Sequence, residues 1–301
     1  MDQFTAMKVF RRVIELEGFS AAARDLRLSN AAVSKNVSEL EVDLGVRLLT
    51  RTTRRLSVTE AGEAYYRRCV RVLDELDEAR DEVSALAHTP RGTLRISAPV
   101  SLGLMHLAPA IPKFLELYPA LKVDLVLNDR VVDLVEEGFD LALRGGGELS
   151  DSNLVARKLA PIRRVVCGAP AYFQRRPVPK VPSDLRDHEC LVYSLSSSPK
   201  QWSFRHDGSD LSVRVDGRYQ VSNSIALKQA LLAGLGLGLV PTFVVGPELR
   251  RKQLRAVLTR FQTAPQSLYA VHPHRQYVPH KTRSFIDFVS AAFGGKPYWD
   301  E

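Results

Sequence analysis

The stretch SAAARDLRLSNAAVSKNVSELEVDLG, residues 20–45, predicts two short helices joined by a tight turn. A serine side chain at the start of a helix accepts a hydrogen bond from a free backbone N–H. We therefore expect Ser20 to cap a helix that ends near Leu26, and Ser29 to cap the next helix. Gly45 follows this second helix, where a left-handed residue often ends a helix.

The helix after Ser29 has an apolar face and a polar face. Apolar residues recur every three or four positions, as on the side of a helix that packs against a core. These residues are Val33, Val37, Leu40 and Leu44. The outward row reads Asn30, Ser34 and Ser38, with Lys35 beside it. Two helices joined by a short turn, the second presenting such side chains, are typical of a helix-turn-helix that enters a DNA major groove. A solvated face on an ordinary surface helix is the alternative.

A basic segment, VRLLTRTTRRLSVTEAG, follows at residues 46–62. It places Arg51, Arg54 and Arg55 among three threonines and continues into RLSV, whose alternation predicts a short strand. We interpret the segment as a β-hairpin wing, because guanidinium groups suit bidentate contact with phosphates. A solvated basic loop is the alternative.

A long helix is predicted next, over residues 63–88. Its apolar residues follow alternating steps of four and three over three heptads, which is the spacing of a coiled-coil seam. The seam residues are Tyr65, Cys69, Val72, Leu76, Ala79, Val83 and Leu86. The acidic residues between them indicate a solvated face. We expect this helix to mediate dimerisation, with packing back on its own domain as the alternative. The sequence HTPRG, from His88, then breaks the helix.

These residues resemble the LysR-type transcriptional regulators. The resemblance rests on FSAAARDLRLSNAAVSKNVSELEVDLGVRLLTRTTRRLSVTEAG and continues into GTLRISAPVSLG and DLVEEGFDLALR. It implies a winged helix-turn-helix over residues 1–62, a linker and dimerisation helix over 63–88, a hinge at 89–92, and an effector-binding regulatory domain over 93–301 that senses a small metabolite.

The resemblance also implies which residues contact DNA. Carried over by position, the base- and phosphate-contacting sites are Ser29, Asn30, Ala31, Ser34 and Lys35 in the helix, and Thr52 and Arg54 in the wing. From the helix face and the wing we add Ser38, Arg51 and Arg55. The chain departs from the family at position 30, which is usually glutamine, and at position 31, which is often proline. It also has Glu17 where a glycine usually precedes the alanine-rich helix.

From Thr93 onward strands and helices alternate, which predicts an α/β domain with a mostly parallel sheet wrapped by helices. A short helix is expected at VVDLVEEG, residues 131–138, before the strand DLALR. The resemblance divides the domain into two Rossmann-like α/β subdomains, as in periplasmic binding proteins. Subdomain I covers about 93–164 and 267–301, and subdomain II about 165–266.

The effector site is predicted from the rule that ligands of open α/β sheets bind beyond the carboxyl ends of strands, often at a helix N-terminus. The rule selects Ser97, Pro99, Val100, Ser101, Asn128, Arg144, Gly145, Ser222, Asn223 and Ser224. Ser101 best matches the family's position, while helix caps and structural ion pairs are the alternative roles for these residues. Helix N-termini favour anions, so we expect a small carboxylate or similarly polar effector. An uncharged aromatic or quinone-like ligand is the alternative.

Enzyme and metal sites are not indicated by the sequence. The glycine-rich GLGLG, residues 234–238, lies between a helix and a strand, whereas a dinucleotide fingerprint needs a strand, glycines and then a helix. His272, His274 and His280 lie near prolines without a carboxylate cluster, and no Gly-x-Ser-x-Gly nucleophile elbow occurs. We therefore expect no catalytic residue, no metal and no cofactor. A periplasmic solute-binding protein is disfavoured by the DNA-binding segment and by the N-terminal sequence, which does not resemble a signal peptide.

Composition agrees with a globular protein that binds a polyanion. The 301 residues are 45% hydrophobic and 25% charged, with a formal net charge of +8. No apolar run approaches the ~18–20 residues of a membrane span, so we expect a cytoplasmic protein that does not bind membranes. The three cysteines, Cys69, Cys167 and Cys190, are odd in number and far apart, which argues against a disulfide framework.

The expected function is sequence-specific regulation of transcription, modulated by a small-molecule effector in the cleft between the two subdomains. The expected partners are a double-stranded DNA operator with partly palindromic half-sites, the effector and further copies of the chain. We expect a homo-oligomer, as a tetramer built from two dimers, and RNA polymerase as a further partner.

Overall fold

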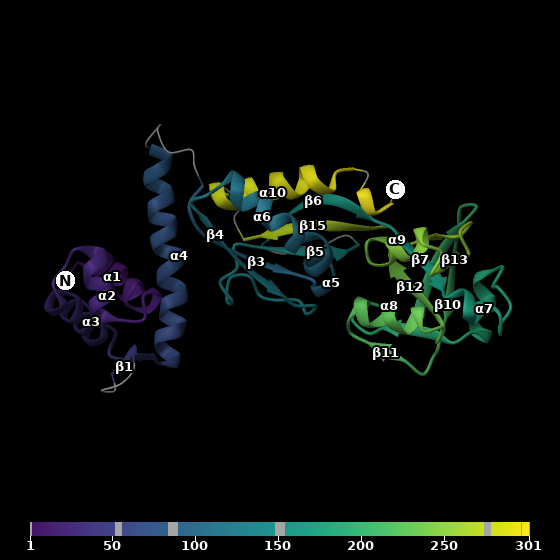
Figure 1. Cartoon of the computed structure of the whole chain (residues 1–301), viewed down its shortest axis with the longest axis horizontal. Coiled ribbons are helices and arrows are strands. Elements are labelled where there is room, and N and C mark those ends of the chain that lie inside the picture. The colour runs from purple at the N-terminus through teal and green to yellow at the C-terminus, as the bar shows by residue number, and fades with distance from the viewer. Residues whose placement is uncertain are drawn as a thin grey trace. The chain divides into compact units, whose positions relative to one another are not determined.

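The computed structural model of the protein describes residues 2–51, 56–83, 90–147, 154–273, 278–295 and 297–300. They belong to two compact units, Met1–Thr89 and Pro90–Glu301 (Figure 1). No helix within these described ranges is long and apolar enough to cross a membrane.

The N-terminal unit is a bundle of helices with a two-stranded hairpin. Its elements are α1 (Gln3–Glu15), α2 (Phe19–Leu26), α3 (Asn30–Leu44), β1 (Leu49–Arg51), β2 (Leu56–Val58) and α4 (Glu60–Val83). Phe10, Val33, Val37 and Leu40 are fully or almost fully buried in its core. Because α2 and α3 are separated by only three residues and share this core, they form a helix-turn-helix.

The caps of α3 are those expected from the sequence. The Ser29 hydroxyl accepts a hydrogen bond from the Ala32 N–H at 3.1 Å, and Gly45 ends the helix with a left-handed φ of +67°. Leu44, which we expected on the apolar face, is 36% exposed. It directly precedes the glycine that ends the helix, beyond the buried face formed by Val33, Val37 and Leu40.

The start of α2 differs from expectation. The helix begins at Phe19 after Gly18, so Ser20 lies inside it and does not cap it. The reason is the turn before it: the Gly18 N–H donates to the Val13 carbonyl at 3.0 Å, and the Gly18 carbonyl accepts from the Ala22 N–H at 3.0 Å. Glu17 enters this turn with a φ of +51°, which costs a non-glycine residue free energy.

A buried carboxylate joins α3 to the hairpin. Glu41 accepts hydrogen bonds from the backbone N–H groups of Leu48 at 2.8 Å and Leu49 at 3.0 Å, and from the Arg47 guanidinium at 3.2 Å. These donors come from the segment that leads into β1. Such charge-assisted bonds fix the position of the wing relative to α3.

The hairpin joins α4 through a tight backbone contact. The Thr59 hydroxyl donates to the Arg47 carbonyl at 2.8 Å and accepts from the Gly62 N–H at 2.9 Å. A Cβ at Gly62 would lie only 2.1 Å from the Leu48 carbonyl oxygen. Only glycine therefore fits at this position in the first turn of α4.

The first part of α4 packs on its own unit, which corrects part of the predicted seam. Cys69 is 0% exposed within the N-terminal core, and the Tyr65 ring lies 5.8 Å from the Phe10 ring. These two residues therefore belong to the domain core, because α1 packs against this face of α4. Val72, 40% exposed, and the half-buried Leu76 lie beyond it. The side chains of Ala79 and Val83, and Leu86 as a whole, lie outside what the structure describes.

The first sheet of the C-terminal unit has the strand order β4-β3-β5-β15-β6. The strands are β3 (Gly92–Ala98), β4 (Leu121–Leu127), β5 (Leu141–Gly146), β6 (Val155–Ile162) and β15 (Gln266–His272). The helices α6 (Ala108–Leu117) and α10 (His280–Phe293) lie beside it (Figure 1). A short α5 (Val100–Leu102) and a π-helix (Gly103–Leu107) connect β3 to α6.

The second sheet has the order β11-β8-β12-β7-β13. Its strands are β7 (Arg164–Gly168), β8 (Cys190–Tyr193), β11 (Gln220–Val221), β12 (Leu237–Pro241) and β13 (Arg255–Val257). Its helices are α7 (Pro170–Phe173), α8 (Ser224–Leu232) and α9 (Thr242–Arg250), with 3₁₀ turns at Pro182–Asp187 and Tyr298–Asp300. A small antiparallel sheet adds β9 (Gln201–His206), β10 (Ser209–Arg214) and β14 (Gln262–Thr263).

Both five-stranded sheets are mixed, not mostly parallel as we expected. In the first, β3 runs parallel to β4 and β5, but β15 runs antiparallel to β5 and β6. The second repeats this pattern around β8, β12 and β7. The chain leaves the first sheet after Ile162 and returns to it at Gln266, and both crossing segments enter antiparallel pairs.

The predicted helix at residues 131–138 is also absent from the described structure, where the segment forms turns. The Asp133 carboxylate accepts hydrogen bonds from the N–H groups of Val135 and Glu136, both at 2.9 Å. This local bonding competes with a longer helix.

Candidate functional site

The polar face of α3 lies at the surface of the N-terminal unit. Ser29, Asn30, Ala31, Lys35 and Ser38 are exposed, and Ser34 is half-buried. The opposite face is buried in the core, so these side chains share one outward surface. This is the arrangement that a recognition helix needs to reach base edges.

Lys35 extends from this face into solvent. Its ammonium lies 3.8 Å from the Glu39 carboxylate, and its side chain is 75% exposed. An exposed pair at this distance contributes little to stability, so the lysine can exchange its partner for another anion at small cost.

An exposed apolar residue extends this surface, and the sequence reasoning missed it. Val42 is 81% exposed and lines a shallow pocket of about 350 Å³ with Lys35, Ser38, Glu39 and Asp43. Its position four residues after Ser38 was the available signal, because residues four apart share a helix face.

The wing is described only in part. β1 and β2 pair antiparallel with Arg51 opposite Leu56, which confirms the predicted hairpin. Thr52, Arg54 and Arg55, together with the side chain of Arg51, lie outside the described residues.

Four of the predicted effector residues come together in the C-terminal unit. The hydroxyl oxygens of Ser101 and Ser224 are 3.5 Å apart, and both residues are buried. Asn223 caps α8 by accepting from the N–H groups of Ile225 at 3.0 Å and Ala226 at 3.2 Å. Val100 begins α5 on the other side of this contact.

Asp129 links these groups, and we did not select it from the sequence. One carboxylate oxygen accepts from the Val100 N–H at 2.9 Å, and the other accepts from the Asn223 amide at 2.8 Å. Burial, followed by the negative charge of Asp129, raises the pKa of Tyr193 to about 12. The available signal was its place at the end of the strand LKVDLVLND, one residue after Asn128.

The other predicted effector residues have local roles. Asn128 accepts from the Arg130 N–H at 3.0 Å, Pro99 precedes α5, Ser97 is buried within β3, and Ser222 is exposed beside Asn223. Arg144 and Gly145, expected after a strand, lie within β5.

The Arg144 guanidinium donates to the Val132 carbonyl at 2.5 Å, and burial lowers its pKa. This hydrogen bond ties the 131–138 segment to β5. Arg144 lies within the strand because β5 continues for two residues beyond the position where we expected it to end.

Comparison with known proteins gives the family. Residues 4–63 match the bacterial regulatory helix-turn-helix protein model of the lysR family, and residues 87–294 match the LysR substrate binding domain. The HTH-type transcriptional activator AaeR of Escherichia coli K12 is 35% identical over 97% of this chain and 94% of its own length.

Solved structures of two whole regulators are similar to this chain over most of its length. CrgA of Neisseria meningitidis, a LysR-type transcriptional regulator, is 34% identical with a TM-score of 0.61 over 95% of this chain and 97% of its own. The Vibrio cholerae virulence activator AphB is 29% identical with a TM-score of 0.59 over 95% of this chain and 98% of its own. The chain therefore belongs to the LysR family of transcriptional regulators, with a helix-turn-helix that binds DNA and a substrate-binding domain that receives a small-molecule effector.

Proposed function

We propose that α3 enters the major groove of the operator and reads it with the polar face described above. The contacting residues are Ser29, Asn30, Ala31, Ser34, Lys35 and Ser38, and the wing contacts phosphates through Arg51, Thr52, Arg54 and Arg55. The observation that carries this proposal is that α3 exposes a polar face while its opposite face is buried in the core.

Salt-dependent binding tests the phosphate contact. Lys35→Ala is expected to weaken operator binding and to lower the slope of log affinity against log salt by about one unit. Lys8→Ala on α1 removes the same charge from another part of the unit and serves as the control. Equal losses in the two variants would show only a general effect of net charge.

Asn30 tests base reading. If Asn30 contacts a base edge, Asn30→Ala loses about 1–3 kcal/mol of discrimination between the operator and scrambled DNA of the same length. Gel-shift titrations with both duplexes measure this difference. An equal loss on both duplexes would make Asn30 a positioning residue.

We also propose that the chain acts as a homo-oligomer, a tetramer of two dimers, on half-sites about 10 base pairs or a multiple apart. The apolar residues of α4 beyond the core, Val72 and Leu76, support a helix seam that continues toward Ala79, Val83 and Leu86. Leu76→Asp would bury a charge in that seam and is expected to dissociate the oligomer in light scattering. An unchanged mass would remove Leu76 from the interface.

The regulator acts with RNA polymerase in the cytoplasm, where its DNA partner lies, and it is not an enzyme. Its matched relatives are transcriptional regulators, which supports this reading.

The effector site, in this proposal, is built by Ser101, Asn223, Ser224 and Asp129. The Asp129 carboxylate accepts hydrogen bonds from the Val100 N–H and the Asn223 amide. An anionic effector binds by replacing Asp129 as the acceptor of these hydrogen bonds. The probes are carboxylates that the enzymes encoded beside this gene produce or consume.

Ser101→Ala is expected to lower the affinity for such an effector about tenfold, ~1.4 kcal/mol, while operator affinity without effector stays the same. Calorimetry and footprinting measure the two quantities. Unchanged effector affinity would leave Ser101 as a structural residue, and a lost footprint would indicate damage to the fold.

A further inference from the structure

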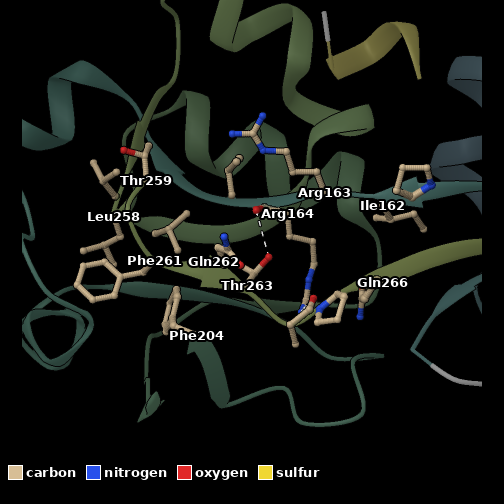
Figure 2. Close-up of a pocket in the computed structure, with 16 residues that line it drawn as sticks. Ile162, Arg163, Arg164, Phe204, Leu258, Thr259, Phe261, Gln262, Thr263 and Gln266 are labelled. Carbon is tan, nitrogen blue, oxygen red and sulfur yellow. Dashed lines mark hydrogen bonds between the residues drawn. The ribbon is translucent and has the colours of Figure 1, made fainter. Parts of the chain in front are cut away.

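A cavity of about 280 Å³ lies where the chain crosses between the two sheets of the C-terminal unit. Both crossing segments line it, residues 161–166 and 262–266, together with Phe204, residues 257–259 and Phe261 (Figure 2). None of the residues proposed above for the effector belongs to this lining. The cavity is therefore separate from the contact between Ser101 and Ser224.

Arg164 supplies a cation to this cavity. It is the first residue of β7, and Figure 2 shows its side chain pointing to the opposite side of the strand from that of Arg163. One guanidinium nitrogen donates to the Ala264 carbonyl at a long 3.3 Å. The Nε–H is buried and has no acceptor within the described part of the chain.

The charge of Arg164 lacks compensation among the described residues. Burial lowers the pKa of the Arg164 guanidinium, and no neighbouring carboxylate raises it again. Removing a cation from water without a counter-ion costs several kcal/mol, so buried arginines are normally paired. By contrast, the exposed Arg205 has a bidentate partner in Asp210 at 2.7 and 3.1 Å.

The rest of the lining mixes apolar and polar groups. Phe204 and Phe261 lie together on one side of the cavity in Figure 2, and Leu258, Pro161 and Pro265 add further apolar surface. Polar groups at the wall come from Thr259, Gln262, Thr263 and Gln266. A pocket that combines apolar side chains with the half-buried Arg164, whose Nε–H is buried and lacks an acceptor among the described residues, suits a monoanion with an apolar body.

We propose that this cavity is a second ligand site, which binds a small organic carboxylate. The carboxylate accepts the Nε–H and an Nη–H of Arg164, and the apolar body packs against Phe204 and Phe261. Bidentate pairing of guanidinium with carboxylate satisfies the buried donor that the protein leaves open.

A ligand in this position contacts both segments that connect the two sheets. Ile162 and Arg164 flank one crossing point, and Thr263 and Gln266 flank the other. The Thr263 hydroxyl also lies 3.4 Å from the Arg164 carbonyl, which ties the two crossings together (Figure 2). A ligand in this cavity therefore gives the regulator a second binding signal, beside the effector of the proposed function. Binding at the two sites is coupled if the crossing segments differ between the free and effector-bound states.

Benzoate is the probe, because it combines one carboxylate with a planar apolar ring. Calorimetry on the full chain is expected to detect benzoate binding, with benzamide, which lacks the charge, at least tenfold weaker. Arg164→Gln is expected to weaken benzoate binding at least tenfold. Lys158→Gln removes the same charge from an exposed position on β6 outside the lining and is expected to stay within twofold of the unchanged protein.

Two further measurements make the test decisive. Ser101→Ala is expected to leave benzoate affinity within twofold, since Ser101 does not line this cavity. A crystal grown with 4-bromobenzoate is expected to show the anomalous bromine signal in this cavity, beside Phe204 and Phe261 at the ring end away from Arg164. This result is independent of whether Arg164→Gln folds. The proposal is overturned if benzoate does not bind, if Arg164→Gln binds it equally well, or if the bromine lies beside Ser101.

Discussion

The N-terminal and C-terminal units differ in how far apart in sequence their functional contacts lie. In the N-terminal unit, Ser29 caps α3 through a residue three positions away, and Glu41 bonds backbone groups seven and eight positions away. In the C-terminal unit, Asp129 bonds Asn223 across 94 residues, and Ser101 meets Ser224 across 123. The surface that we propose reads DNA is thus presented by local structure. The residues that we propose for the effector site come together only when distant segments fold.

This comparison predicts that the N-terminal unit can be unfolded without affecting the other. Gly62→Ala forces a Cβ to within 2.1 Å of a backbone oxygen, and we expect a loss of about 3 kcal/mol in the stability of that unit. Calorimetry of the full chain is expected to show its transition lowered while that of Pro90–Glu301 is unchanged. Glu63→Ala, at the exposed neighbouring position, is the control. Equal shifts in both transitions would contradict the local character of the first unit.

A smaller effect on the same unit is expected from Glu41→Gln. The amide keeps the shape of the side chain but loses charge-assisted bonds to Leu48, Leu49 and Arg47, which costs about 2 kcal/mol. Asp43→Asn, on the exposed side of α3, removes the same charge without those bonds. Urea unfolding of the two variants separates the effects, and similar midpoints would mean that the bonds of Glu41 contribute little.

The C-terminal unit is expected to respond to pH through a long-range contact. Buried His106 bonds the Phe243 carbonyl at 2.9 Å and the Tyr298 hydroxyl at 2.5 Å, and burial lowers its pKa below 6.5. The unfolded chain then binds more protons, so stability is fully present above about pH 6.5 and is lost as pH falls toward the lowered pKa.

Urea unfolding between pH 7.5 and 5 checks this expectation against His106→Gln. The variant is expected to lose part of the pH dependence, while His188, whose pKa burial also lowers, retains its own share. An identical pH dependence in both proteins would assign the effect elsewhere.

The smallest expected effect has the opposite sign. Glu17 has a φ of +51°, and Glu17→Gly is expected to stabilise the N-terminal unit by about 0.5–1 kcal/mol because glycine adopts this conformation without strain. Thermal unfolding measures the gain. Glu15→Gly, at the last residue of α1, is expected to destabilise, because it places glycine in a helix and removes the ion pairs of Glu15 with Arg11 and Arg12.

The parts of the fold that were predicted from sequence are those with short-range causes. The Ser29 and Gly45 caps, the apolar face formed by Val33, Val37 and Leu40, and the hairpin follow from neighbouring side chains and turn chemistry. Where a prediction was wrong, the residue has a contact or a hydrogen-bonded turn nearby that the local sequence pattern does not reveal. Ser20 does not cap α2, because the turn at Gly18 starts the helix at Phe19. Cys69 lies in the core, because α1 packs on that face of α4.

The sequence by itself determined the family, the helix-turn-helix and the outward polar row of α3, because helix periodicity and capping act over a few residues. It also indicated Ser101, Asn223 and Ser224 as residues near strand ends and helix starts. Only the tertiary structure decided that Asp129 joins two of these segments and that Arg164 lies in a cavity between the crossing strands. Burial and charge pairing depend on which distant segments become neighbours, and the spacing of residues along a chain does not contain that information.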